Sequence, residues 1–352
     1  MDNDERIRAA FRRQADFCDA MDAPMTAAIA RELADGLDRT TRTGQAVLDW
    51  PGDPIADALP LRLIGGLHAL HRAGQAVGFD GDAGRLRAAL VDHDAALRPW
   101  LDGPPQTNEP GRSAALMLGL LHLAQRYGPR FEVLELGASA GLNLLIDRYR
   151  FDLGGVLVGP ESPVLLRPEW RGPPPPPAPV EIGAVRGVDV APIDLTDPAA
   201  ATRLAAYVWI DATERQVRLD HAIAMVRRHG VALDRGDAAD WIDARLAEPQ
   251  AEGVTRVVLH SVVWQYLGPE RQTRIRAAIQ AAGARATADR PFGWVMLEPN
   301  RDLAAHEVRV RDWPGARAME VVAHAHAHGA WIEGLPAPQP ADDYVLSGVA
   351  PV

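Results

Sequence analysis

A run of small residues follows an apolar segment near the middle of the chain. The apolar segment is Val133–Leu136, and Gly137-Ala138-Ser139-Ala140-Gly141 comes directly after it. This order predicts a buried strand, a tight turn and the start of a helix at Leu142. Backbone N–H groups at such a helix start point outward, and residues without bulk let a ligand approach the main chain closely. The segment therefore predicts a corner that binds an anion or a nucleotide.

Two known turn chemistries fit this corner only in part. A dinucleotide turn needs glycine at its first, third and sixth positions, and here Ser139 and Leu142 occupy the last two. The five residues also match the G-x-S-x-G elbow of serine hydrolases, with Ser139 as nucleophile and Asp237 and His260 following in triad order. Such an elbow is preceded by several strands, whereas the residues before Phe131 have helical spacing. The hydrolase is the less favoured alternative.

The third interpretation is binding of S-adenosylmethionine. The stretch that begins at Glu135 resembles the acidic-x-Gly-x-Gly-x-Gly turn of class I methyltransferases, and three later segments resemble other pieces of that family in the same order. Asp189 ends a segment like the second strand, whose acid accepts hydrogen bonds from the ribose hydroxyls. Asp237 and Ala238 lie in a segment like the turn that binds the adenine edge. The segment 257–267 resembles the fourth strand and the loop that faces the transferred methyl group.

Two features depart from the methyltransferase pattern. Ser139 stands at the middle glycine, where it is small enough for the turn if its φ angle is negative. Asp189 follows Glu135 at more than twice the spacing of about 20 residues that is usual in nucleotide-binding βαβ units. A proline-rich insertion at about 150–182, with consecutive prolines at 173–177, accounts for most of the extra length.

Taken whole, the chain resembles a bacterial family catalogued as domain of unknown function family 2332. The resemblance covers nearly all of residues 5–334. It implies a methyltransferase-like domain and supplies no known substrate. The segments that carry it are 106–116, 134–151, 186–198, 237–242 and 260–267.

The resemblance to methyltransferases implies a role for each matching residue. Glu135 and the turn would hold the methionine end of the cofactor, Asp189 the ribose, and Asp237 the adenine. Asn108 and Arg112 are candidates for the methionine carboxylate, although Asn108 could equally cap a helix. The full predicted cofactor-binding set is Asn108, Arg112, Glu135, Gly137, Ala138, Ser139, Gly141, Asn143, Asp189, Asp237 and Ala238.

Methyl transfer needs few dedicated catalytic groups, because displacement at a sulfonium depends mainly on alignment and the exclusion of water. His260 and Trp264 are the predicted catalytic residues on the acceptor side. A neutral imidazole can accept a proton near neutral pH, and an indole face can pack beside a sulfonium cation. Each residue also has a purely structural interpretation: His260 could be a hydrogen-bonded residue at a strand end, and Trp264 could belong to a core between the domains. For Trp264 the core interpretation is favoured over the catalytic one. The product would be S-adenosylhomocysteine.

Three histidines alternate along a predicted strand near the end of the chain. Because His324, His326 and His328 are spaced by two, their imidazoles would share one face. A His-x-His pair on a strand can chelate zinc, but no nearby acidic or sulfur ligands complete such a site in the sequence. The sequence therefore predicts a solvent-facing or substrate-facing row and no bound metal.

Composition limits the classes of function. The length of 352 residues predicts two domains, and the net charge of −10 disfavours nucleic acid and membranes as partners. All 37 basic residues are arginine, which excludes Schiff-base and Lys-dependent phosphate-loop chemistry. The single cysteine, Cys18, is predicted to be a small core residue. A charged N-terminus and the lack of long apolar stretches predict a cytoplasmic protein.

The residues that could do chemistry must be positioned by an α/β fold. Residues 1–128 have helical spacing and predict an all-helical lid or substrate domain. Residues 129–334 alternate short β-branched runs with helical segments, which predicts a mostly parallel sheet with an antiparallel last strand. The resemblance implies a Rossmann-like methyltransferase domain there, and 335–352 is predicted to be a tail. The predicted strands are 132–136, 184–188, 256–259, 293–297, 307–310 and 321–326, with a weaker one at 231–233.

The favoured function is therefore S-adenosylmethionine-dependent methyl transfer to an unknown small molecule or a protein side chain, with a small-molecule acceptor as the main partner. The alternative is a non-catalytic module that binds the cofactor, its product, or neither. The sequence does not predict an oligomeric state.

Overall fold

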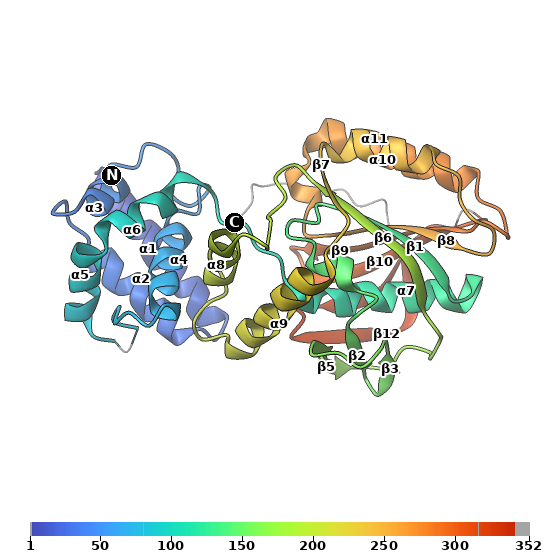
Figure 1. Ribbon diagram of the computed structural model, residues 1–352, viewed down its shortest axis with the longest axis horizontal. Helices are drawn as coiled ribbons and strands as arrows, with labels where there is room; N and C mark the ends of the chain where they lie inside the picture. The colour runs from blue at the N-terminus through green and yellow to red at the C-terminus, as the bar shows by residue number, and fades with distance from the viewer. Residues whose placement is uncertain (1, 80, 316, 342–352) are drawn as a thin grey trace. The chain divides into compact units, whose positions relative to one another are not determined.

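The computed structural model describes residues 2–79, 81–315 and 317–341, and its chain forms two compact units (Figure 1). The first unit contains the described residues up to 107 together with 196–220. The second contains 108–195 and the described residues from 221 onward. The mixed α/β class predicted from the sequence is confirmed.

The first unit consists of helices joined by turns. Side chains that satisfy the first backbone amides mark two of the helix starts: Thr41 accepts from Gly44 N before α3, and Asp82 accepts from Gly84 N and Arg85 N before α5. Helix α9 (Thr213–His229) begins in this unit and continues into the second. The other elements are α1 (Asn3–Ala20), α2 (Pro24–Gly36), α3 (Arg42–Leu48), α4 (Leu59–Arg72), α5 (Ala83–Asp92), α6 (Asp94–Leu97), η1 (Arg98–Asp102) and α8 (Pro198–Ala206).

Apolar side chains from α1, α2 and α4 build the core of the first unit. Phe11, Leu33 and Leu63 are fully buried in it. Cys18 lies in the same cluster, with Gln14 Nε2 3.4 Å from its sulfur, and burial raises the pKa of its thiol. The predicted core role of Cys18 is confirmed.

The second unit is built on a sheet that has nine strands within the described residues, in the order β5-β12-β11-β10-β9-β8-β1-β6-β7. The strands from β7 to β9 run parallel, whereas β10, β11 and β12 continue from β9 as an antiparallel meander. Their bounds are β1 (Arg130–Leu136), β5 (Glu169–Arg171), β6 (Glu181–Asp189), β7 (Leu233–Arg235), β8 (Thr255–Ser261), β9 (Phe292–Asn300), β10 (Ala305–Trp313), β11 (Met319–Ala325) and β12 (Trp331–Ala341). A small separate sheet pairs β2 (Arg150–Leu153) with β3 (Val156–Val158) and β4 (Leu165–Leu166).

Helices cover both faces of the large sheet (Figure 1). Helix α7 (Ser113–Tyr127) packs against β9, β10 and β11 on one face, and α10 (Ala238–Ala247) and α11 (Gly268–Ala284) cover the other. Ile275 and Ile279 of α11 share a buried apolar cluster with Leu134, Val258 and Trp294 from the strands. Strands β1, β8 and β9 are mostly buried on both sides and have apolar centres, whereas β6 and β7 near the edge of the sheet are largely half-buried or exposed.

All of the predicted strands are present, and the weakest, predicted at 231–233, lies at Leu233–Arg235. The antiparallel part is larger than predicted. Strand β12 extends into the predicted tail and pairs antiparallel with β11, whereas β5 from the proline-rich insertion pairs with β12 in parallel. Residues 342–352 of that tail lie outside the described residues.

The unit boundaries differ from the predicted division at residue 128. Helix α7 belongs to the second unit, because it packs on the sheet. Helix α8 belongs to the first unit, because it packs against α4, where His68 Nδ1 lies 3.0 Å from Ala206 O. The turn after β1 leads into η3 (Leu142–Leu145), a 3-10 turn of 4 residues, and not into the predicted helix.

Candidate functional site

Four predicted site residues lie along the edge of the sheet where the parallel strands have their carboxyl ends, which we call the carboxyl edge. Glu135 is near the end of β1, Asp189 ends β6, Asp237 follows β7, and His260 is near the end of β8. Chain order reverses between β1 and β8, because β6 and β7 lie on one side of β1 while β8 and β9 lie on the other. In open α/β sheets, ligands bind at the carboxyl edge beside such a reversal.

The turn after β1 is closed by hydrogen bonds within the chain. Four of its amides donate to acceptors that come mostly from other segments: Ala138 N to Val188 O (3.0 Å), Ser139 N to Asp189 Oδ2 (2.9 Å), Gly141 N to Ala138 O (2.7 Å) and Leu142 N to Asn108 Oδ1 (2.8 Å). The prediction that amides here point outward is therefore wrong for these four residues. With η3 only 4 residues long, the corner is not an anion site of the helix-start kind.

Three residues of this turn have positive φ angles: Gly137 (67°), Ser139 (55°) and Gly141 (76°). The expectation of a negative φ at Ser139 is wrong, because the hydrogen bond to Asp189 holds its amide in the left-handed conformation. A Cβ on Gly137 would lie 2.8 Å from the Cβ of Val263 in the turn after β8. Glycine at 137 is thus required for close packing of the two turns.

Glu135 is buried, with 1% of its surface exposed. Its Oε1 accepts from Asn143 Nδ2 at 2.8 Å. Ser113 Oγ donates to Asn143 Oδ1 at 2.7 Å, and Asn143 Nδ2 lies 3.4 Å from Ser261 Oγ. The other carboxyl oxygen, Oε2, has no hydrogen-bond partner among the residues that the structure describes. Burial raises the pKa of Glu135 to about 7, although the Asn143 bond and the charge of Arg112 lower it. Glu135 is therefore an acid that changes its charge near neutral pH and has one unpaired oxygen.

Asp189 and Asp237 are half-buried at the same edge. Besides its bond to the turn, Asp189 accepts through Oδ1 from the backbone amide two residues later, at 2.8 Å. Asp237 immediately precedes Ala238 and caps α10, because its Oδ1 accepts from Ala239 N at 2.9 Å. Its other oxygen pairs with Arg271. Burial opposes ionisation of Asp237, but the bonds from Arg271 and the helix amides outweigh it and lower the pKa. Each carboxylate oxygen has two lone pairs, so both acids can accept further bonds from a ligand.

Asn108 and Arg112 lie just before α7. The side-chain oxygen of Asn108 accepts from the amide of Leu142, so it caps η3 from a distant part of the sequence. The side chain of Arg112 is buried, its Nε donates to Ala327 O at 3.0 Å, and its charge lowers the pKa of Glu135. Asn108 thus has the capping role that the sequence left open, but it caps η3 and not the helix that follows Asn108 in the chain.

The two predicted catalytic residues are in the interior, with 0% of His260 and 1% of Trp264 exposed. His260 Nδ1 lies 2.7 Å from Glu298 Oε1, and its ring stacks on Trp264 with centroids 5.0 Å apart. Nε2 of His260 has no partner in the described part of the chain. Trp264 belongs to the apolar cluster under α11, so its core interpretation is confirmed within the second unit. The hydrogen-bonded strand end is confirmed for His260, and a catalytic role for either residue stays a prediction.

Sequence reasoning missed Glu298, Ser113 and Ser261. Glu298 is fully buried at the end of β9, and its Oε1 accepts from Val263 N at 3.2 Å and Trp264 N at 3.3 Å as well as binding His260. A sequence signal existed, because Glu298 directly follows the apolar segment predicted as a strand at 293–297, much as Glu135 lies near the end of another apolar segment.

The predicted histidine row is not formed as a strand face. Strand β11 ends at Ala325, so it contains His324, whereas His326 and His328 lie in the following turn with ring centroids 5.4 Å apart. Across the described ranges, no three His, Cys, Asp or Glu side chains gather in a group that could hold a metal ion.

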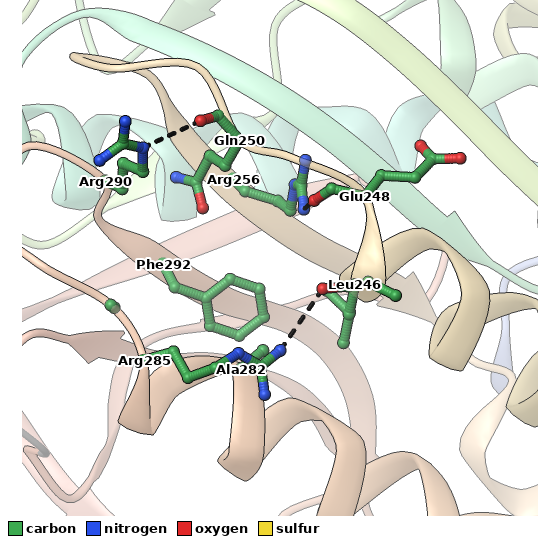
Figure 2. Close-up of a pocket in the computed structure, with 10 residues that line it drawn as sticks. Leu246, Glu248, Gln250, Arg256, Ala282, Arg285, Arg290 and Phe292 are labelled. Atoms are coloured by element: carbon green, nitrogen blue, oxygen red, sulfur yellow. Dashed lines mark hydrogen bonds between the residues drawn. The ribbon is translucent and has the colours of Figure 1, made fainter.

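A cavity of about 500 Å³ lies at the opposite end of the strands, lined by Arg256 and Phe292 at the starts of β8 and β9 (Figure 2). Its arginines donate to backbone carbonyls at and beyond the end of α10: Arg256 to Glu248 O at 2.8 Å, Arg285 to Leu246 O at 3.4 Å and Arg290 to Gln250 O at 3.1 Å. These contacts satisfy carbonyls left unpaired where a helix ends. The arginines of this cavity therefore have a structural role, and the carboxyl edge remains the candidate site.

The fold and the carboxyl edge define an α/β protein with a topological switch point, the place where ligands bind in open α/β sheets. A family model described as "Uncharacterized protein conserved in bacteria (DUF2332)" matches residues 8–333, and the chain belongs to this family. No curated protein and no solved structure matches the chain. Among the described residues, no helix combines the length and the apolar character needed to cross a membrane.

Proposed function

We propose that this protein uses S-adenosylmethionine to methylate a small molecule or a protein side chain. The observation that carries the proposal is the row of Glu135, Asp189 and Asp237 at the carboxyl ends of three adjacent strands, β1, β6 and β7. S-adenosylmethionine presents hydrogen-bond donors in a matching order along its length: an ammonium group, ribose hydroxyls and an adenine amino group. Acceptors in the same order beside a switch point support this ligand.

The residues fit the cofactor through carboxyl oxygens that can accept further hydrogen bonds. Glu135 Oε2 is suited to the ammonium group, because an unpaired buried oxygen is costly and a cationic donor would relieve that cost. Asp189 would take the ribose hydroxyls while it holds the turn at Ser139, and Asp237 with Ala238 would hold the adenine edge. Arg112 is the proposed partner of the methionine carboxylate. When bound, the cofactor supplies an electrophilic methyl group.

Asp237→Asn tests the adenine assignment without removing the helix cap, because asparagine is as good an N-cap as aspartate. We expect the variant to bind S-adenosylhomocysteine about tenfold more weakly, from the loss of a charged acceptor, when measured by isothermal titration calorimetry. Asp240→Asn is the matched control, because Asp240 lies in the same helix turn, pairs with Arg274 and is exposed. Equal affinity of Asp237→Asn and the unchanged protein would reject the assignment, and no binding to the unchanged protein would reject the cofactor.

One observation favours the serine hydrolase as a second candidate. The φ angle of Ser139 is 55°, and the nucleophile of a G-x-S-x-G elbow sits on a similarly strained turn. Against it, His260 is fully buried in the sheet, and its Nε2, the atom that would have to contact the Ser139 hydroxyl, has no hydrogen-bond partner among the described residues. Covalent labelling of Ser139 by a fluorophosphonate would establish the hydrolase. Cofactor binding without transfer to any acceptor in a methylation assay would instead favour a non-catalytic module.

A further inference from the structure

Two neighbouring turns at the carboxyl edge contain a residue other than glycine in the left-handed conformation. Ser139 follows β1 with a φ of 55°, and Val262 follows β8 with a φ of 53°. A positive φ is a genuine outlier for a β-branched residue such as valine. Strain of this kind persists only where the surroundings enforce it, and it concentrates at sites of ligand binding. The turn at 262–264 is therefore under a constraint that the fold must supply.

Glu298 supplies that constraint from the end of β9. One oxygen of its fully buried carboxylate accepts from the amides of Val263 and Trp264 and lies 2.7 Å from His260 Nδ1. The amide of Val262 itself donates to Leu297 O at 3.0 Å. A single buried acid thus holds the turn on β9 while Val262 remains strained.

The constrained turn places Val263 against Gly137. The Cβ atom that Gly137 lacks would lie 2.8 Å from the Cβ of Val263, and Val263 is half-buried. The three atoms nearest to that missing Cβ all belong to Val263, the closest being its Cγ2. Because Gly137 comes two residues after Glu135, Val263 is an apolar side chain close to the turn that follows the unpaired acid.

We propose that Val263 limits the size of the group carried on the sulfur of the methyl donor, and that Glu298 is the positioning residue that holds Val263 in place. This inference rests on the proposed function, because it takes the donor's sulfur to lie between Glu135 and Asp189. Removing two methyl groups at 263 then enlarges the space at the sulfur without touching the acids that bind the rest of the donor.

The test compares S-adenosylmethionine with its S-ethyl analogue by isothermal titration calorimetry. We expect the unchanged protein to prefer the methyl form by about tenfold or more, the value of one methylene in a tight apolar site. Val263→Ala and Glu298→Gln should reduce this preference to about threefold or less, whereas a merely structural role would weaken both ligands by the same factor. Val190→Ala is the control, because Val190 follows β6 at the same edge and is exposed. An unchanged preference in Val263→Ala would overturn the proposal.

A second measurement needs no ligand and separates the two proposals. In Glu298→Gln, amide hydrogen exchange at Val263 and Trp264 should accelerate by about tenfold relative to Val258 within β8, because a charged acceptor is lost. Unchanged exchange would overturn the role of Glu298 even if the cofactor binds. Faster exchange in a protein that binds neither ligand would leave the turn's constraint standing and overturn both the cofactor and the role of Val263.

Discussion

The buried carboxyl group of Glu135 lowers the stability of the fold wherever the solution pH would ionise it. Its pKa is about 7 in the folded chain, against an ordinary value of 4.5. Below about pH 4.5 the group is protonated in both states and costs nothing. As the pH rises toward 7, the unfolded chain releases the proton while the folded chain keeps it, so the free energy of unfolding falls.

Glu135→Gln should therefore gain stability relative to the unchanged protein between about pH 5 and about pH 8, by up to about 3 kcal/mol. Urea unfolding at the two pH values measures this difference. Glu132→Gln is the control, because Glu132 lies on the same strand but pairs with Arg256 at 2.8 Å and is partly exposed. If both variants show the pH dependence of the unchanged protein, Glu135 ionises in the normal range.

Among individual residues, the sequence predicted which acids gather but not how they are used. Glu135, Asp189 and Asp237 were found because each lies near or just after the end of a recognisable strand. Glu298 was missed, since nothing in its local sequence says that it binds amides of the turn after β8. Hydrogen bonds of the turn after β1 were also unpredictable, because Asn108 supplies one acceptor from a segment before the strand.

At the scale of elements, the turn after β8 makes a prediction about backbone strain. Alanine is normally better tolerated than glycine, because glycine loses more conformational entropy on folding. At Val262 the order should reverse, since only glycine adopts a φ of 53° without cost. We expect Val262→Gly to be more stable than Val262→Ala by about 1 kcal/mol in urea unfolding.

The neighbouring position provides the comparison for this prediction. Val263 has a φ of −118°, so Val263→Ala should be more stable than Val263→Gly. The same order at both positions would mean that Val262 is not strained in solution.

Elements buried on both faces were the most predictable. Strand β8 (Thr255–Ser261) is buried at every position, and its central apolar residues 257–259 gave its place to within two residues. Strand β12 was missed because Pro336, Pro338 and Pro340 argue against a strand. Those prolines lie beyond the stretch 331–333 that pairs with β5. Within the described residues, the proline-containing part of β12 therefore pairs with β11 but not with β5. Proline is tolerated in a strand that has a free edge.

At the scale of the whole molecule, helical periodicity predicts that a helix exists but not which core it joins. Helix α7 has the same kind of apolar spacing as α4, yet it packs on the sheet of the second unit. The segment 196–220 returns to the first unit after the chain has already built β1 and β6. Such discontinuous units depend on contacts between residues far apart in sequence, which no local pattern encodes.

Asp211 shows how this returning segment completes the first unit. Helix α2 begins after Ala23, which has no side chain that could cap it. Asp211 takes that role from 196–220, because its carboxylate accepts from Met25 N at 2.7 Å, Thr26 N at 3.0 Å and Thr26 Oγ1 at 2.6 Å. The start of α2 is thus satisfied only when the returning segment is in place.

Asp211→Ala should consequently cost about 2 kcal/mol of unfolding free energy, because it leaves the amide and the hydroxyl of the buried Thr26 without their acceptor. Asp220→Ala is the matched control from the same segment, since its pair with Arg72 is half exposed and should contribute less than about 1 kcal/mol. Urea unfolding followed by tryptophan fluorescence measures both, because Trp209 lies in the same segment and packs edge-on against Phe17 with centroids 6.0 Å apart. Similar small losses in the two variants would show that α2 does not depend on Asp211 for its cap, and that 196–220 is held to the first unit mainly by apolar contacts.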